Sequence, residues 1–251
     1  MNRLKMLVIA GGLVASACGA PPDDPEALTV ETSSDVPLPT DAVAAEWTGY
    51  RAGGNEPFWN LVLTDSTMDF TDIGTDAAVS APIPVAVEMT EGWRFAATWQ
   101  GQPFVAEVRI VGCGDSMSGR PFPHSVTVTV AGQTYQGCGG DTATLLTGSE
   151  WRVAQIQGVD AASVAPTMTF GEDGSLTGTG SCNRFSATYE ITGEGIEIGP
   201  ALATRMACTD ETLNQQETRF FSLLEEITRF DVVEGRLQMY TQDTVVLVAD
   251  R

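Results

Sequence analysis

The sequence has few cations: 251 residues hold 13 Lys and Arg against 33 Asp and Glu, a formal net charge of −20. Lys5 is the only lysine and His124 is the only histidine. Clustered Lys and Arg hold a phosphate backbone, so this composition argues against a nucleic-acid partner. It also argues against electrostatic docking on anionic lipid. Schiff-base and phosphate-loop chemistry, which depend on lysine, have almost no candidate residue.

Motifs typical of enzymes are also missing. The chain contains no G-x-S-x-G, no H-E-x-x-H, no complete phosphate loop and no dinucleotide-binding fingerprint. No C-x-x-C occurs, which disfavours a zinc site. We therefore predict no enzymatic activity, no cofactor and no bound metal. Pairs of carboxylates occur in any acid-rich chain, so a carboxylate-based hydrolase stays open as an alternative.

The first 17 residues have the pattern of a signal peptide. Arg3 and Lys5 precede an apolar stretch of about a dozen residues, too short for a membrane-spanning helix of about 20. Ala15-Ser16-Ala17 then leads into Cys18. This arrangement resembles the bacterial lipoprotein lipobox, which implies cleavage before Cys18 and lipid attachment to its sulfur. An ordinary secretory signal is the alternative. With Gly19 next, we expect the outer membrane, facing the periplasm.

Residues 18–45 predict a lipidated cysteine followed by a tether. The segment is rich in proline and acid, and it shows no sustained apolar period. Such a composition cannot offset its ordering entropy, so we expect disorder. Cleavage would leave eleven arginines against 33 acids, a net charge of −22 with no lysine. We interpret this charge mainly as surface adaptation, with an acidic face for a basic protein partner as the alternative.

Four further cysteines, Cys113, Cys138, Cys182 and Cys208, suit disulfides in an oxidising compartment. Three connectivities are open to four cysteines. We favour the sequential one, Cys113 with Cys138 and Cys182 with Cys208, because each bridge then stays inside one predicted domain.

Residues 46–145 predict a β-rich domain. Short apolar runs alternate with turn residues, which is typical of an antiparallel sheet folded into a small sandwich or barrel. The expected strands cover 58–63, 84–89, 93–99, 104–110 and 125–130, with a further run at 134–135.

Two segments of this domain are more particular than strand patterning requires. They read G-N-E-P-F-W at 54–59 and C-G-D-S-M-S at 113–118. Together they resemble a bacterial envelope protein family with a GNEPFW motif, which implies no activity. For Asn55, Glu56 and Trp59 two interpretations stay open. One is a capped turn with the tryptophan in the core; the other is a ligand site with Trp59 as stacking surface and Glu56 as acceptor.

Residues 146–251 predict a second domain. Its ordered signals are Trp151, F-x-x-D-G at 170–174, C-N-R-F at 182–185 and T-R-M-A-C at 204–208. This order resembles the META domain of HslJ-type heat-shock lipoproteins. The resemblance implies a β-rich fold with one packed helix and a role in envelope stress resistance.

The helix, at 210–228, also follows from the residues. Thr209 and Asp210 are good N-cap candidates, and Leu213, Phe220, Leu224 and Ile227 share one face.

Glu217 lies on the same helix face, where a carboxylate is costly unless it is paired. We expect Arg184 and Arg205 to pair with it, in an ion pair or hydrogen-bonded brace under the disulfide. The alternative is the floor of a polar pocket with Asn183 and Thr204. The pairing predicts that Glu217→Leu keeps the fold and that Arg205→Ala destabilises it.

The sequence thus predicts a mainly β, β-rich α+β protein of two small antiparallel sandwich- or barrel-like domains. The expected function is that of a non-catalytic cell-envelope lipoprotein, membrane-bound through Cys18, that supports envelope integrity or stress and drug resistance. An acidic inhibitor of a basic protein such as lysozyme is the alternative, besides the hydrolase. The oligomeric state stays open.

Overall fold

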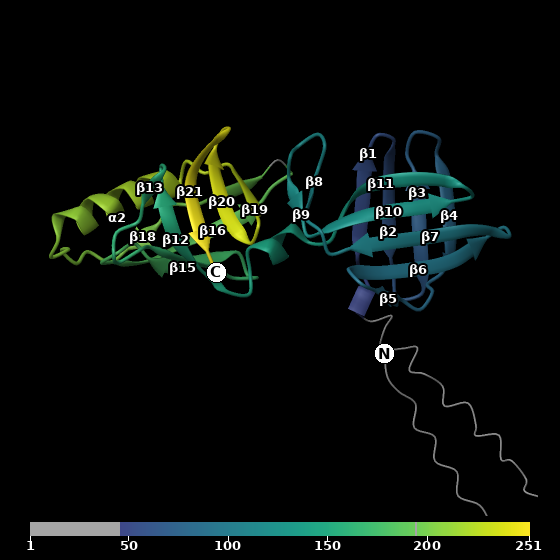
Figure 1. Cartoon of the computed structure of the whole chain (residues 1–251), viewed down its shortest axis with the longest axis horizontal. Helices are drawn as coiled ribbons and strands as arrows, with labels where there is room; N and C mark the ends of the chain where they lie inside the picture. The colour runs from purple at the N-terminus through teal and green to yellow at the C-terminus, as the bar shows by residue number, and fades with distance from the viewer. Residues whose placement is uncertain (1–45, 194) are drawn as a thin grey trace, which may run out of the picture. The chain divides into compact units, whose positions relative to one another are not determined.

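The computed structural model describes residues 46–193 and 195–251 (Figure 1). The signal peptide predicted for 1–17, the lipid site at Cys18 and the tether at 18–45 lie outside the described residues. The described chain is mainly β, with helix α2 (Glu211–Leu224) beside the second sheet, so the predicted fold class is confirmed. Within this part of the chain, no helix is both long and apolar enough to cross a membrane.

The first sheet has nine antiparallel strands in the order β4-β3-β2-β1-β11-β10-β7-β6-β5. Contacts between β4 and β6 show that the sheet curls toward closure. Its inward residues alternate with outward ones, as Phe104, Ala106 and Val108 do on β7. Its strands are β1 (Arg51–Asn55), β2 (Phe58–Leu63), β3 (Thr67–Asp72), β4 (Ala77–Pro82), β5 (Val87–Met89), β6 (Gly92–Trp99), β7 (Gln102–Arg109), β10 (His124–Val130) and β11 (Gln133–Gly139).

Two short strands, β8 (Cys113–Gly114) and β9 (Pro121–Phe122), form a separate hairpin between β7 and β10. A disulfide joins Cys113 to Cys138 on β11, with 5.5 Å between the Cα atoms. The hairpin is therefore attached covalently to the edge of the paired region between β1 and β11.

Trp59 fills the core beside this region. Its side chain is 1% exposed and stacks on Phe70, with 5.9 Å between the ring centroids. The ladder between β1 and β11 ends where Gly53 pairs with Cys138. Trp59 Nε1 donates to the carbonyl of Gln136, two residues before Cys138, at 3.1 Å. The indole thus satisfies a backbone oxygen at the point where strand pairing stops.

The second sheet follows the order β17-β16-β15-β14-β12-β21-β20-β19, with β13 on β12 and β18 on β16. Contacts between β17 and β19 bring its ends together. The short 3-10 helix η1 (Thr142–Leu145) precedes it. Its strands are β12 (Glu150–Ile156), β13 (Val159–Asp160), β14 (Thr167–Phe170), β15 (Ser175–Thr179), β16 (Arg184–Ile191), β17 (Ile196–Ile198), β18 (Leu202–Ala203), β19 (Arg229–Val233), β20 (Arg236–Thr241) and β21 (Thr244–Asp250).

Helix α2 begins and packs much as the sequence predicts. Asp210 is the N-cap, and its side chain accepts the Thr212 N–H at 2.8 Å. Phe220 and Leu224 are buried in the core of the second sheet. The helix ends at Leu224, earlier than predicted, and Ile227 is buried in the segment that follows.

Gly54 provides a direct test of the Trp59 packing. A Cβ atom there would lie 2.5 Å from the Gln136 carbonyl oxygen and would overlap Trp59 Nε1. Because both groups are fixed, we expect Gly54→Ala to lower the free energy of unfolding by about 1–3 kcal/mol. Gly112→Ala is the control, since its Cβ meets nothing within 4 Å. Denaturant unfolding measures both; equal stability of the two variants would contradict the packing.

Candidate functional site

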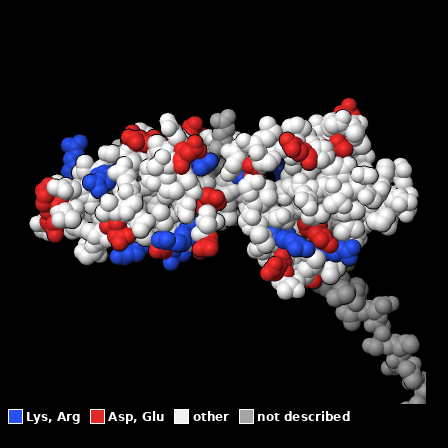
Figure 2. All heavy atoms as spheres, turned by 45° about the horizontal axis from the view of Figure 1, so that its top comes forward, with Lys and Arg blue, Asp and Glu red and all other residues white. Residues whose placement is uncertain are grey.

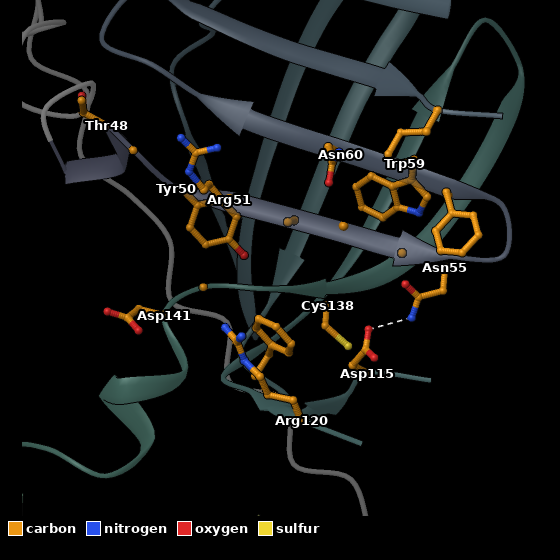
Figure 3. Close-up of a pocket in the computed structure, with 18 of the residues that line it drawn as sticks. Thr48, Tyr50, Arg51, Asn55, Trp59, Asn60, Asp115, Arg120, Cys138 and Asp141 are labelled. Carbon is orange, nitrogen blue, oxygen red and sulfur yellow. Dashed lines mark hydrogen bonds between the residues drawn. The ribbon is translucent and has the colours of Figure 1, made fainter. Parts of the chain in front are cut away.

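A groove of about 740 Å³ lies along β1 (Figure 3). Its polar residues include Arg51 at one end and Asn55 at the other, and Arg120 enters from the β8–β9 hairpin. Phe58 and Ile73 add half-exposed apolar surface. The groove therefore offers both signs of charge and an apolar rim, which suits a ligand of mixed polarity.

A second hollow, of about 600 Å³, shares part of this lining. Glu56 and Arg109 line only the second hollow. The residues common to both are Gly53, Gly54, Asn55, Asp115 and Cys138. The two motifs singled out in the sequence thus meet at a ridge between the two hollows.

One side-chain contact joins the two motifs at this ridge. Asn55 Nδ2 donates to Asp115 Oδ2 at 2.7 Å and to Ser116 Oγ at 3.1 Å. Asp115 Oδ1 accepts the N–H groups of Met117 at 3.1 Å and of Ser118 at 2.7 Å. The Ser118 hydroxyl donates to the same oxygen at 2.8 Å. Asp115 therefore fixes the loop closed by the Cys113–Cys138 disulfide.

These bonds determine the charge of Asp115. Partial burial by itself would raise the pKa of its carboxyl. Hydrogen bonds from the Ser118 backbone and hydroxyl, the Asn55 amide and the Met117 N–H outweigh that effect and lower the pKa to about 2. Asp115 is therefore ionised at neutral pH.

The structure corrects one interpretation of the GNEPFW motif. Trp59 borders the groove, but it is only 1% exposed and its indole is bonded to the backbone, so it offers almost no ring surface to a ligand. The prediction of a stacking surface is wrong, and the tryptophan fills the core instead. Glu56 is exposed on the turn after β1, and the Asn55 amide binds the loop that carries Asp115.

His124, at the start of β10, lies next to Tyr50, which lines the groove. Tyr50 Oη and His124 Nδ1 are 3.3 Å apart. Burial lowers the pKa of His124 and raises the pKa of Tyr50. Both rings are thus favoured in the neutral form.

A second polar cluster surrounds Glu217 in α2, whose side chain is buried. Its Oε2 accepts the N–H groups of Cys182 and Asn183, both at 2.8 Å. Its Oε1 accepts the Asn183 amide. Asn183 Oδ1 accepts hydrogen bonds from the Thr204 hydroxyl at 2.8 Å and from the Met206 N–H at 2.7 Å. The carboxylate thus fixes the loop closed by the Cys182–Cys208 disulfide.

The expected partners of Glu217 are wrong. Arg184 and Arg205 are exposed, and neither forms an ion pair with it among the described residues. Backbone N–H groups and an asparagine amide satisfy the buried carboxylate without burying a second charge. The hydrogen-bonded brace therefore exists, but no arginine takes part in it. Thr204 is exposed and reaches the cluster only through Asn183.

Both predicted disulfides are present. The sulfur atoms of each sequential pair lie at bonding distance, which confirms the predicted connectivity. Cys182, Cys208 and Glu217 bring three ligand-type atoms within 4.8 Å of one another. Because the two sulfurs are bonded together, they offer no thiolate to a metal ion.

The sequence alone did not reveal Asp115 as a partner of Asn55, 60 positions away. A local signal was present in both loops. Asp115 follows Cys113 by two residues, and Asn183 follows Cys182 directly. A carboxylate or amide next to a disulfide cysteine is well placed to bind loop backbone groups.

These observations define a disulfide-braced, β-rich protein, and the comparisons extend the description. The model of the META domain family matches residues 144–251. This part of the chain is therefore a META domain, as its motifs predicted.

Two solved structures show a likeness. One NMR structure is 22% identical, with a TM-score of 0.37, and covers 44% of this chain and 95% of its own. The NMR structure of a protein from Burkholderia xenovorans is 24% identical, with a TM-score of 0.36, and covers 43% and 85%. Comparison with curated proteins gives no match.

The Glu217 cluster predicts a large effect for one substitution and a small effect for another. Glu217→Leu leaves the N–H groups of Cys182 and Asn183 without an acceptor, so the free energy of unfolding should fall by about 2 kcal/mol. Arg205 is exposed and forms no ion pair within the described part of the chain, so Arg205→Ala should change this free energy by less than about 0.5 kcal/mol. Denaturant unfolding tests both. Strong destabilisation by Arg205→Ala would instead support an ion pair between Arg205 and Glu217.

Asp115 predicts a pH dependence of stability. Its folded pKa lies below the ordinary value of 3.8, so it stabilises the fold above about pH 4, and this contribution is lost as the pH falls toward 2. We expect the melting temperature of the wild type to exceed that of Asp115→Asn at pH 6, with the difference shrinking between pH 4 and about 2. Asp65→Asn, at an exposed residue, is the control. A difference that stays constant over this range would contradict the assignment.

Proposed function

We propose that this protein is a non-catalytic, lipid-anchored protein of the bacterial cell envelope that supports envelope integrity under heat and drug stress. The META domain relates the chain to HslJ-like envelope-associated proteins. The signal pattern before Cys18 supports export and anchoring. The membrane is thus the first partner, through a lipid on Cys18.

The observation that carries the proposal is the pair of disulfides. Each closes a loop of similar length, with sequence separations of 25 and 26. Disulfides of this kind form and persist in oxidising compartments such as the periplasm. A carboxylate also binds backbone N–H groups of each loop: Asp115 from within the first, and Glu217 from helix α2 for the second. Both sheets therefore carry the same adaptation to an oxidising environment.

The hydrogen bonding of Asp115 and Glu217 supports a binding role over a catalytic one. Asp115 accepts four hydrogen bonds and stays ionised far below neutral pH. A general acid or base works best with a pKa near the operating pH. Glu217 is held by backbone groups away from either hollow. We assign ligand contact to the groove along β1.

The charge on the face shown in Figure 2 gives little support to the inhibitor alternative. On the face shown in Figure 2, acidic side chains alternate with arginines and do not form one acidic surface. A basic protein bound by charge attraction would need a continuous region of one sign.

A deletion strain tests the proposal. We expect it to lose tolerance to heat and to envelope-active drugs, and the wild-type gene to restore that tolerance. Cys18→Ala should not restore it, because the exported chain lacks its anchor. Cys18→Ala expressed at the wild-type level, checked by immunoblot of membrane and soluble fractions, keeps the comparison matched. Parental tolerance in the deletion strain would contradict the stress role, and full restoration by Cys18→Ala would contradict the anchor.

A further inference from the structure

Each disulfide-closed loop carries a methionine whose side chain stands in solvent. Met117 is 72% exposed and Met206 is 60% exposed. Met68, Met168 and Met239 are instead fully buried, at 0%. The two exposed thioethers therefore occupy a different environment from the core methionines of the same sheets.

The loops hold these side chains outward. Met117 N–H donates to Asp115 and Met206 N–H donates to Asn183, at 3.1 and 2.7 Å. Each methionine is therefore bound at its own backbone, inside a loop that a disulfide closes. A loop fixed in this way cannot fold its apolar side chain against the core, so the sulfur atom stays accessible.

Few other groups compete for an electrophilic oxidant. The four cysteines of the described residues are already joined in disulfides. Lys5, in the predicted signal peptide, is the only lysine, so no lysine amine remains after cleavage. His124 is only partly exposed. Oxidation of methionine follows exposure. Met89 is half-buried, so Met117 and Met206 are the most exposed methionines of the described residues and the first targets.

We propose that Met117 and Met206 are oxidation sites that consume hypochlorous acid at the protein surface. The thioether sulfur attacks the chlorine atom, giving a chlorosulfonium ion and hydroxide. Water then adds to sulfur and displaces chloride with loss of protons. In sum, one thioether and one HOCl give one sulfoxide, one proton and one chloride. Sulfur loses two electrons and chlorine gains them.

The positions suit this chemistry because the product does little damage. A sulfoxide is polar and disrupts a packed core. At Met117 and Met206 it would form in solvent, while the disulfides and carboxylates continue to hold the loops. The inference uses the proposed envelope location only as the source of the oxidant.

The test uses the purified chain with its disulfides intact. It is treated with up to two molar equivalents of HOCl, quenched with free methionine and mapped by mass spectrometry. We expect Met117 and Met206 to gain one oxygen atom at least about tenfold faster than Met68, Met168 and Met239. The melting temperature should not change. Equal rates at all five residues, or a fall in melting temperature from oxidation at these two alone, would overturn the proposal.

A second arm tests the role. A methionine-containing reporter peptide is mixed with wild type, with the double variant Met117→Leu/Met206→Leu, or with the control Met239→Leu. We expect wild type and the control to protect the peptide from HOCl and the double variant to lose most of that protection. Equal protection by all three would refute the role.

The same variants separate this inference from the proposed function. In the deletion strain, the double variant should restore heat and drug tolerance but not HOCl tolerance. Restoration of HOCl tolerance would overturn only the oxidation sites. Parental heat and drug tolerance in the deletion strain would overturn only the stress role.

Discussion

Each of the two disulfide-closed loops is supported by a carboxylate. This carboxylate accepts hydrogen bonds from an asparagine amide and from backbone N–H groups. Asp115 binds Asn55 on β1 of the first sheet, and Glu217 binds Asn183 in the loop before β16 of the second. A carboxylate oxygen bonded by several N–H groups is a strong acceptor, because its charge is compensated without a buried cation. The same arrangement on two sheets of different strand order indicates a shared physical requirement of the loops.

The rest of the surface architecture follows from these contacts. The ridge between the two hollows exists because Asn55 reaches across to the loop carrying Asp115. The loop after β18 is fixed because Asn183 binds Met206. The disulfides alone constrain only their own cysteines, whereas the carboxylates fix the residues between them. Rigid loops of this kind present a preformed surface, which reduces the entropy lost on binding.

Local signals in the sequence were sufficient for much of the fold. Alternating apolar residues predicted the sheets, and Asp210 predicted the start of α2. The even set of cysteines, with one pair in each predicted domain, predicted the disulfides. The predicted partners of Glu217 were wrong because a sequence shows which residues carry opposite charge. It does not show the direction in which a loop N–H group points. The Asn55–Asp115 contact spans 60 positions and depends on the hairpin being tied to β11. Trp59 was ambiguous because its burial depends on the distant carbonyl of Gln136.

Amide hydrogen exchange tests the central claim most directly. Five backbone amides of the two loops donate to a side-chain oxygen: those of Met117, Ser118, Cys182, Asn183 and Met206. Asn183 is buried, and the other four residues are exposed or half-exposed. We predict slow exchange at these amides, with protection lost at Cys182 and Asn183 in Glu217→Leu and at Met117 and Ser118 in Asp115→Ala. Exchange as fast as in an unstructured chain, with the disulfides intact, would contradict the account.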